Sequence, residues 1–264
     1  MDSKASDIIA RIKSADETEF EAMRRALAAD TRRSVIDALN KKEKRIAALR
    51  AEEARVRSLY DCQNTIAKNR LVVGLDEVGR GPVAGPLAIG AVVLNSEPII
   101  MGINDSKQLS AKKREELSEV IKQKALASCV VFIEPEEIDE LGMSACLRKG
   151  FSSALRQIED TGIHPEVVLI DGNPLHIDPR EINVVKGDAR CASIAAASII
   201  AKVERDKLMD ECASLYPAYG FESNKGYASE QHINAIVEQG LSPIHRKTFC
   251  TSFLDAARQT RLPI

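Results

Sequence analysis

The stretch Val72–Gly85, VVGLDEVGRGPVAG, holds the features that decide the fold of this chain. A run of apolar, strand-forming residues stops at two adjacent carboxylates, Asp76 and Glu77, and a glycine-rich segment follows. Strand ends seldom need two neighbouring charges, and glycine lets other groups approach the backbone closely. The stretch therefore predicts a buried strand that brings acidic side chains to a functional site.

Strand-like and helix-like segments alternate after residue 70. Apolar, β-rich runs predict five strands, over residues 71–76, 87–94, 127–135, 166–171 and 181–186. Helices are predicted over residues 110–126, 136–159 and 189–217, the first with Ser110 at its start. The first half of the last helix is rich in Ala and Ser, which let a helix lie close against a sheet. This β-β-α-β-α-β-β-α order predicts an α/β fold, a mixed sheet flanked by helices.

The first 70 residues have the pattern of helices throughout. Ser6 is a possible N-cap of the first helix, and residues 17–30 place Phe20, Met23 and Leu27 on one face. A long helix is predicted from about residue 31 to residue 60. Its heptad-like apolar stripe is broken by Lys42 and Glu53. The polar segment DCQNTIAKNR, residues 61–70, is interpreted as a linker.

Charge is unevenly distributed along a chain whose formal net charge is −2. Residues 31–70 carry 11 Lys and Arg against 5 Asp and Glu, a net charge of +6, and residues 71–264 carry 21 against 27, or −6. A basic arm beside an acidic body suits a metal enzyme that acts on a polyanion. A solvated helix face is the simpler explanation of the arm.

The sequence also indicates a compartment. The six cysteines lack CxxC spacing and are interpreted as reduced thiols, so a cytoplasmic location is expected. The first residues have no long apolar core typical of a secretory signal, and no apolar run approaches about 18 residues, so no membrane span is expected.

Four carboxylates are candidate metal ligands. Asp76 and Glu77 end the first strand, Asp171 ends the strand of residues 166–171, and Asp188 precedes the Ala-rich helix. Neighbouring strands would bring these positions together, and divalent cations would resolve the repulsion among them. Two such ions can clamp the attacking and leaving oxygens of a phosphodiester. Taken singly, Asp188 is explained as a helix cap and Asp171 as a turn residue.

Seven ordered motifs resemble bacterial ribonuclease HII and cover essentially all of residues 71–250: GLDEVGRGPVAGP, INDSKQLS, VVLIDGN, VVKGDAR, AAASIIAKVERDKLM, YPAYGFESNKGYAS and PIHRKTF. The resemblance implies a ribonuclease H-like fold over residues 70–264 with a C-terminal helical part. Residues 1–69 would then be a helical N-terminal extension and a possible arm for binding the hybrid. The sequence disfavours ribonuclease HIII, which has Gly-Thr-Gly in place of Gly79–Gly81 and a β-containing N-terminal domain.

The implied activity is cleavage of the RNA strand of RNA–DNA hybrids and nicking 5′ of single ribonucleotides in duplex DNA, leaving 3′-hydroxyl and 5′-phosphate ends. Such an enzyme would act in ribonucleotide removal from DNA. By resemblance two Mn²⁺ or Mg²⁺ ions would bind the four carboxylates. The substrate would meet the Gly-Arg-Gly motif, the junction-sensing tyrosine and the lysine of the DSK motif, which correspond to Gly79, Arg80, Gly81, Tyr227 and Lys107.

Several alternatives remain at this stage. In isolation, Tyr227 is explained as a surface tyrosine and Lys107 as a solvated lysine. Another ribonuclease H-like nuclease, or a non-catalytic nucleic-acid-binding module, would share parts of the pattern. A monomer is expected, and His232 and His245 are assigned to structural hydrogen bonds. The tail QTRLPI, residues 259–264, faintly resembles a sliding-clamp-binding peptide, although a frayed terminus is the favoured interpretation.

Overall fold

The computed structural model describes residues 4–260, with side chains described as far as residue 254. The chain divides into two units, one up to Arg57 and one from Ser58 onward. Each unit has an apolar core of its own. Helix α3 (Arg33–Ala67) contributes residues to both units.

The first unit is a small group of helices made by α1 (Ala5–Ser14), α2 (Glu17–Ala26) and the first part of α3. Phe20 is buried in its core, with Met23 and Leu27 packed against the same cluster, which confirms the predicted apolar face. The predicted cap at Ser6 is wrong, because α1 begins at Ala5 and places Ser6 inside the helix. The strong cap belongs to α2, where Asp16 and Glu19 form a reciprocal capping box.

The polar break in the stripe of α3 has a structural explanation. The Lys42 ammonium donates to the carbonyl oxygens of Lys13 and Ala15, at 3.1 and 2.6 Å. These carbonyls lie at the end of α1, where a helix has unsatisfied acceptors and partial negative charge. The side chain of Leu49, further along the stripe, is 56% exposed, so the stripe is not buried along its whole length.

The interpretation of residues 61–70 as a linker is wrong, because α3 continues as a helix to Ala67. Gln63 is buried, and its side-chain oxygen accepts from both the amide and the hydroxyl of Ser193, at 2.9 and 2.6 Å. Tyr60 accepts a hydrogen bond from the amide of Ile100. These contacts hold a polar stretch in a helix that its local composition does not favour.

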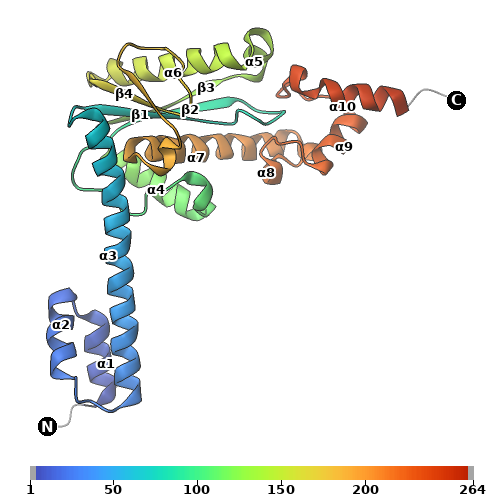
Figure 1. Cartoon of the computed structure of the whole chain (residues 1–264). Helices are drawn as coiled ribbons and strands as arrows, with labels where there is room; N and C mark the ends of the chain where they lie inside the picture. The colour runs from blue at the N-terminus through green and yellow to red at the C-terminus, as the bar shows by residue number, and fades with distance from the viewer. Residues whose placement is uncertain (1–3, 261–264) are drawn as a thin grey trace. The chain divides into compact units, whose positions relative to one another are not determined.

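The second unit is built on a five-stranded mixed sheet with the order β3-β2-β1-β4-β5 (Figure 1). The strands are β1 (Val72–Val78), β2 (Leu87–Val93), β3 (Ala127–Ile133), β4 (Val167–Asp171) and β5 (Glu181–Val184). β1, β2 and β3 pair antiparallel, whereas β4 runs parallel to both β1 and β5. The predicted mixed α/β sheet is confirmed, but the single helix predicted over residues 136–159 is wrong. Gly142, with φ +75°, separates two helices there, Pro135–Leu141 and Met143–Asp160.

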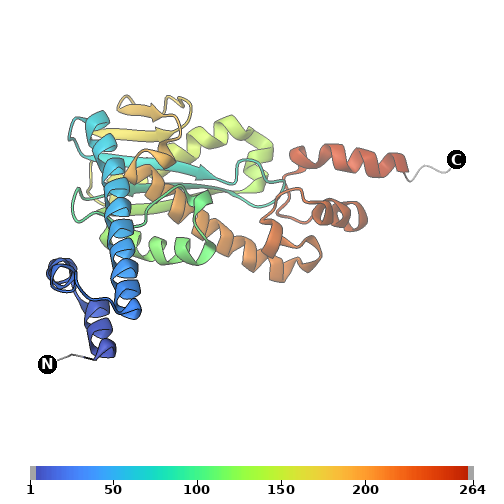
Figure 2. The ribbon, with the colours of Figure 1, turned by 60° about the horizontal axis from the view of Figure 1, so that its bottom comes forward.

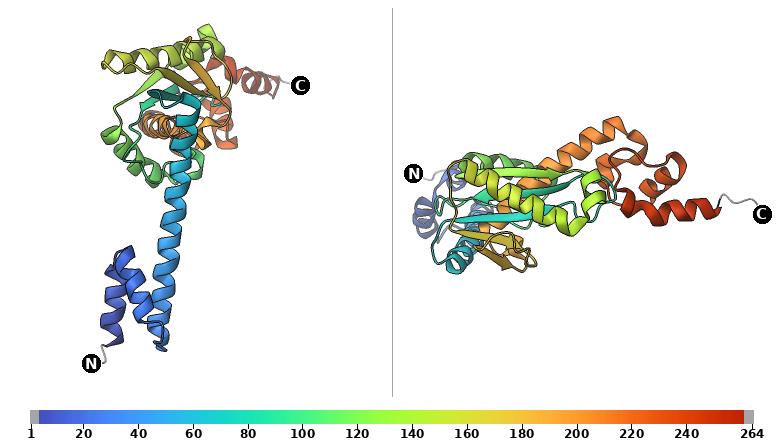
Figure 3. Two further views of the ribbon diagram at one scale, coloured as in Figure 1. Left: turned by 60° about the vertical axis from the view of Figure 1, so that its left-hand side comes forward. Right: turned by 90° about the horizontal axis from the view of Figure 1, so that it is seen from above.

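Helices cover both faces of the sheet, as Figures 1 and 3 show. The helix α6 (Met143–Asp160) packs on one face, and α7 (Ala192–Leu215) lies along the other with α4 (Ala111–Lys124) beside it. Ser110 caps α4 as predicted. The remaining elements are α5 (Pro135–Leu141), α8 (Phe221–Asn224), α9 (Glu230–Gln239), α10 (Lys247–Thr260) and the 3₁₀ turns η1 (Ser106–Gln108), η2 (Gly187–Ala189) and η3 (Pro217–Tyr219).

Two strand glycines let α7 lie unusually close to the sheet. A Cβ atom at Gly74 of β1 would lie 2.3 Å from the backbone of Ser193. One at Gly90 of β2 would lie 2.2 Å from the carbonyl oxygen of Ala197. The small residues of α7 and these glycines together bring the helix backbone against the centre of the sheet, as its composition predicted.

The C-terminal helices gather at one end of the sheet, around a second core that includes Met209, Tyr219, Phe221 and Ile236 (Figure 2). Residues 261–264 of the tail, which carry most of the possible clamp-binding peptide, lie outside the described residues. Among the residues that the structure describes, no helix is both long and apolar enough to cross a membrane.

Candidate active site

The site begins where β1 and β4 end side by side. The parallel register pairs Leu75 with Ile170, so Asp76 and Asp171 follow at the same end of adjacent strands. Both strands are buried apolar runs, as expected for the centre of a sheet covered on both faces. The expectation that these strands are neighbours is thus confirmed.

The two carboxylates of β1 are held in a buried environment. Asp76 is 5% exposed, and one of its carboxylate oxygens accepts from the amide of Glu77 at 2.8 Å. Burial raises the pKa of Asp76 well above its usual value, and the charges of Glu77, Asp171 and Asp188 raise it further, against a hydrogen bond from Ser198. Burial likewise raises the pKa of Glu77 to about 7.

The turn η2 brings Asp188 to the end of β4. The Asp171 carboxylate accepts from the amide of Gly187 at 2.5 Å, which ties the turn to the strand. Asp188 is buried, and one of its oxygens lies 3.4 Å from the Lys107 ammonium. Asp188 does not cap α7, whose N-cap is Cys191, so the cap interpretation is wrong. Asp171 bonds across sixteen residues rather than within its own turn.

A pocket of about 320 Å³ collects six of the nine candidate residues. The candidates that line it are Glu77, Gly79, Arg80, Gly81, Lys107 and Tyr227. They come from the end of β1, the turn η1 and the loop after α8, which are far apart in the sequence. Asp76, Asp171 and Asp188 are not among the lining residues, but their charges act on those at the pocket.

The carboxylates suit a hard divalent cation by chemistry, and they lie close enough for the charges of Glu77, Asp171 and Asp188 to act on Asp76. All four offer only oxygen donors, and burial, together with the charges of the other three carboxylates, raises the pKa of Asp76. Yet no three His, Cys, Asp or Glu side chains within the described residues form a group that could hold a metal ion. In this structure the Asp171 carboxylate accepts from the amide of Gly187, and the Asp188 carboxylate pairs with the Lys107 ammonium.

Two different neighbours limit which side chains the Gly-Arg-Gly loop can carry, Arg205 at Gly79 and Tyr227 at Gly81. Gly79 has φ +91°, and a Cβ there would lie 2.2 Å from Nε of the buried Arg205. Packing thus requires glycine at position 79. At Gly81 a Cβ would meet only the Tyr227 ring, at 3.7 Å, so this glycine opens the pocket itself. The Arg80 side chain is 63% exposed and lies 3.9 Å from Glu77.

Sequence reasoning missed several residues of the site. Ser198 bonds to Asp76, lies 3.0 Å from the hydroxyl of Ser106, and lines the pocket with Lys202. Its position in an Ala- and Ser-rich helix had indicated only a packing role. The buried Arg205 and Arg246 behind the loop carried no local signal, because their partners are distant carbonyl oxygens.

Comparison with known proteins agrees with this architecture. A family model described as Ribonuclease HII matches residues 73–252, and one described as Ribonuclease HII N-terminal domain matches residues 4–66. The ribonuclease HII of Clostridium acetobutylicum is 46% identical over 228 residues, which cover 84% of this chain and 85% of that protein.

Solved structures share the fold of the second unit. The ribonuclease H2 of Pyrococcus horikoshii matches with a TM-score of 0.62 at 30% identity, covering 72% of this chain and 99% of that one. The ribonuclease HII of Archaeoglobus fulgidus, solved in complex with PCNA, matches with a TM-score of 0.56 at 26% identity, covering 67% of this chain and 93% of that one.

The mixed sheet with acidic residues at the ends of its central strands defines the protein as a ribonuclease H, an endonuclease of the phosphodiester backbone. Within that class, the match over residues 73–252 and the bacterial relative decide the type. The chain belongs to the ribonuclease HII family.

Proposed function

We propose that the protein cleaves the RNA strand of RNA–DNA hybrids and nicks duplex DNA on the 5′ side of a single embedded ribonucleotide. The products would carry 3′-hydroxyl and 5′-phosphate ends, and the role would be ribonucleotide removal from DNA. The observation that supports this most strongly is the pocket in which Glu77, the Gly-Arg-Gly loop and Tyr227 face one space.

The acidic residues have the chemistry to hold two divalent ions, Mg²⁺ or Mn²⁺. Asp76, Glu77, Asp171 and Asp188 would be the ligands. Bound divalent ions supply the charge that activates water and stabilises a departing oxygen. The protein's own contribution is to bury Asp76 at the end of β1 and Asp188 in η2, with Glu77 and Asp171 partly buried beside them, which limits their contact with water. Lys107 balances Asp188 and is a candidate phosphate contact.

The substrate contacts follow from the groups that line the pocket. The 2′-hydroxyl is the only group that marks a ribonucleotide within DNA. The backbone at Gly81 can approach it because no side chain intervenes. Arg80 is exposed and can pair with a phosphate through its planar guanidinium. The half-exposed Tyr227 ring stands beside Gly81, where it can pack on the next deoxyribose and disfavour a ribose.

The decisive experiment compares three duplexes with and without Mg²⁺ or Mn²⁺: an RNA–DNA hybrid, a DNA duplex with one ribonucleotide, and an all-DNA duplex. We expect metal-dependent cuts in the first two, with the single nick mapped to the 5′ side of the ribonucleotide. Cleavage of the all-DNA duplex would instead favour a different ribonuclease H-like nuclease. Binding without any cleavage in Mn²⁺ would favour a non-catalytic module.

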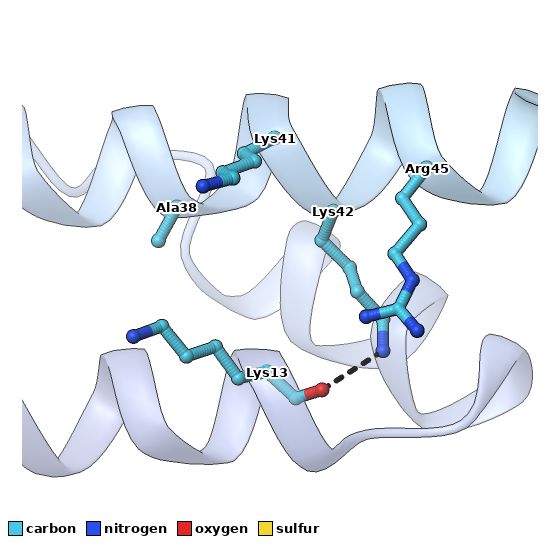
Figure 4. A pocket seen from close by; sticks show the side chains of 5 residues that line it. All are labelled: Lys13, Ala38, Lys41, Lys42 and Arg45. Atoms are coloured by element: carbon cyan, nitrogen blue, oxygen red, sulfur yellow. Dashed lines mark hydrogen bonds between the residues drawn. The ribbon is translucent and has the colours of Figure 1, made fainter.

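For the N-terminal unit we propose a role in gripping the backbone of the hybrid. A groove of about 330 Å³ between α1 and α3 is lined by Lys13, Ala38, Lys41, Lys42 and Arg45 (Figure 4). Lys42 is bonded to α1, but no ion pair is found for Lys13, Lys41 or Arg45 in the part of the chain that the structure describes. The positive charge of this groove is complementary to the negative charge of a nucleic-acid backbone.

We also propose that the C-terminal tail is the point of any sliding-clamp contact. The support is the PCNA complex of the archaeal relative and the short pattern of residues 259–264. Binding is measured with the sliding clamp purified from the same organism. Loss of this binding on removal of residues 259–264 would support the contact. Unchanged binding would exclude the tail.

A further inference from the structure

Two adjacent residues, His245 and Arg246, lie between the loops that the proposed function uses. Their side chains are 2% and 0% exposed, so neither can touch substrate directly. Their backbone pairs with the Gly-Arg-Gly loop: His245 forms a bridge with Ala84, and the amide of Arg246 donates to the carbonyl of Val83 at 2.8 Å. The proposed reaction gives these two buried polar side chains no role.

The Arg246 guanidinium donates hydrogen bonds to four carbonyl oxygens of one loop, residues 79–85. It donates to Gly79, Arg80, Pro82 and Gly85 at 2.7, 3.1, 2.9 and 3.0 Å. No ion pair with a carboxylate is found for it among the described residues. The guanidinium also lies over the Phe249 ring, 5.4 Å from its centroid. A buried charge held by carbonyl oxygens and a ring is costly to maintain, which makes a purely space-filling role a poor explanation.

This bonding sets which way the loop's amides point. In a planar trans peptide, the carbonyl of one residue and the N–H of the next point in opposite directions. Because Arg246 draws the carbonyls of Gly79 and Arg80 inward, the N–H groups of Arg80 and Gly81 point away from it. No backbone acceptor for these two N–H groups is found in the described part of the chain. They are therefore available as donors at the pocket.

His245 reaches the other loop through a second imidazole. The amide of Ser242 can only donate, and it lies 2.9 Å from Nδ1 of His245, so the proton of His245 is on Nε2. That Nε2 lies 3.0 Å from Nε2 of His232, which must then accept and carry its own proton on Nδ1. Nδ1 of His232 donates to the carbonyl of Tyr227 at 2.8 Å. The tautomers thus form one consistent chain ending at Tyr227.

Both imidazoles are neutral in this arrangement. Burial lowers the pKa of His245 to about 4, with a further contribution from His232, and burial also lowers the pKa of His232. The rings pack edge-on against Tyr219 and Phe221, which fixes their planes. Two neutral, packed imidazoles can hold the Tyr227 carbonyl in one place, whereas two positively charged imidazoles would repel each other.

We propose that His245 and Arg246 are positioning residues for ribonucleotide recognition. Arg246 orients the amides of the Gly-Arg-Gly loop, and His245, through His232, fixes the backbone that carries Tyr227. The adjacency of the two residues in the chain ties the two loops together. This inference rests on the proposed roles of Gly81 and Tyr227.

The two amide substitutions of His232 provide a matched test. In His232→Asn the amide nitrogen takes the place of Nδ1 and can still donate to Tyr227, whereas in His232→Gln the amide replaces Nε2 and that donor is lost. The measured quantity is the ratio of kcat/KM on the single-ribonucleotide duplex to kcat/KM on the long hybrid. We expect His232→Gln to lower this ratio about fivefold or more, as loss of one hydrogen bond allows, and His232→Asn to remain near wild type.

Equal ratios in the two variants, provided that both melt as cooperatively as wild type, would overturn the positioning role of the histidine pair. A double-mutant cycle adds a readout that general destabilisation would not reproduce. In a Tyr227→Ala background, His232→Gln should not change the ratio further, because it acts only through Tyr227.

The same series separates this inference from the proposed function. An unchanged ratio in Tyr227→Ala would exclude Tyr227 as the sensor of the ribonucleotide. A changed ratio in Tyr227→Ala with no effect of His232→Gln would exclude only the proposed role of the histidine pair.

For Arg246 the test is Arg246→Lys, which keeps the positive charge but loses the planar guanidinium with its several donors. We expect kcat/KM to fall about tenfold on both ribose-containing substrates. Wild-type kcat/KM in this variant would overturn its role.

Discussion

At the scale of single residues, burial perturbs the acidic side chains at the end of β1 more than any neighbouring charge does. Within the part of the chain that the structure describes, the hydrogen-bond partners found for the Asp76 carboxylate are Ser198 and the amide of Glu77. Its raised pKa means that the buried Asp76 carboxylate resists ionisation beside the other acidic groups. A cation that binds these oxygens would offset both the burial and the repulsion.

Asp76→Asn should abolish cleavage and spare most binding. We expect cleavage to fall at least about a hundredfold, the magnitude typical for a group that stabilises transition-state charge, with the hybrid Kd within about threefold. Cleavage gels and fluorescence anisotropy measure the two quantities. Mn²⁺ should raise the melting temperature of the wild type more than that of the variant. Near-normal turnover in Asp76→Asn would contradict its assignment as a ligand.

Glu77 predicts a pH dependence of stability in the absence of metal. Its pKa is about 7 in the folded protein against 4.5 for a free side chain, so the folded state holds the proton more tightly. Its contribution to stability is therefore present below pH 4.5 and is lost as the pH rises through 7, by about 3 kcal/mol at most.

Urea unfolding of the wild type and Glu77→Gln in EDTA, at pH 5 and pH 8, measures this contribution. The free energy of unfolding of the variant minus that of the wild type should increase from pH 5 to pH 8. The comparison cancels the opposite effect of His245, whose lowered pKa costs stability as the pH falls from 6.5 toward 4. A difference that does not vary with pH would show that Glu77 titrates normally.

At the scale of elements, the close approach of α7 to the sheet positions the site. Gly74 and Gly90 leave no room for a side chain between sheet and helix. The helix in turn carries Ser198 and Lys202, which line the pocket. The geometry of the pocket therefore depends on two positions that never contact substrate.

Two glycine-to-alanine changes should separate folding from function. Gly90→Ala forces a Cβ to within 2.2 Å of a backbone oxygen and should lower the free energy of unfolding by about 1–3 kcal/mol or more. Gly81→Ala has room for its Cβ, 3.7 Å from the Tyr227 ring, and should fold normally but cleave poorly because the methyl group enters the pocket. Thermal melts and cleavage rates measure the pair. The reverse pattern would contradict the proposed substrate contact at Gly81.

At the scale of the whole molecule, each unit has a site lined by cationic side chains. Lys13, Lys41, Lys42 and Arg45 line the groove of the first unit, and Arg80, Lys107 and Lys202 line the pocket of the second beside Glu77. An arm that contributes only electrostatic contacts should affect binding at low salt more than at high salt.

The double variant Lys41→Gln/Arg45→Gln tests the groove, with Arg33→Gln/Lys44→Gln on the same helix as a control of equal charge. We expect the groove variant to reduce the slope of log Kd against log salt by up to about two, because each of the two cations would neutralise one phosphate. The control pair, which does not line the groove, should change the slope less. Equal slopes in the two variants would leave the arm with a packing or spacer role.

The pairing of β1 with β4, which brings Asp76 and Asp171 to the same end of the sheet, was decided by the tertiary structure. The sequence alone determined the mixed α/β class and the order of the strands among the helices. It did so because these depend on local composition and on apolar runs that only a buried sheet can satisfy. The small residues of α7 likewise predicted its close packing.

Only the tertiary structure decided what depends on partners distant in the chain. Residues 61–67 are helical because Gln63 bonds to Ser193, and Asp188 lies in a turn tied to Asp171 instead of capping α7. The carbonyls that Arg246 holds and the imidazole that His245 meets carry no signal in their own neighbourhoods. Hydrogen bonds of this kind are decided by geometry after the chain has folded, and local composition does not encode them.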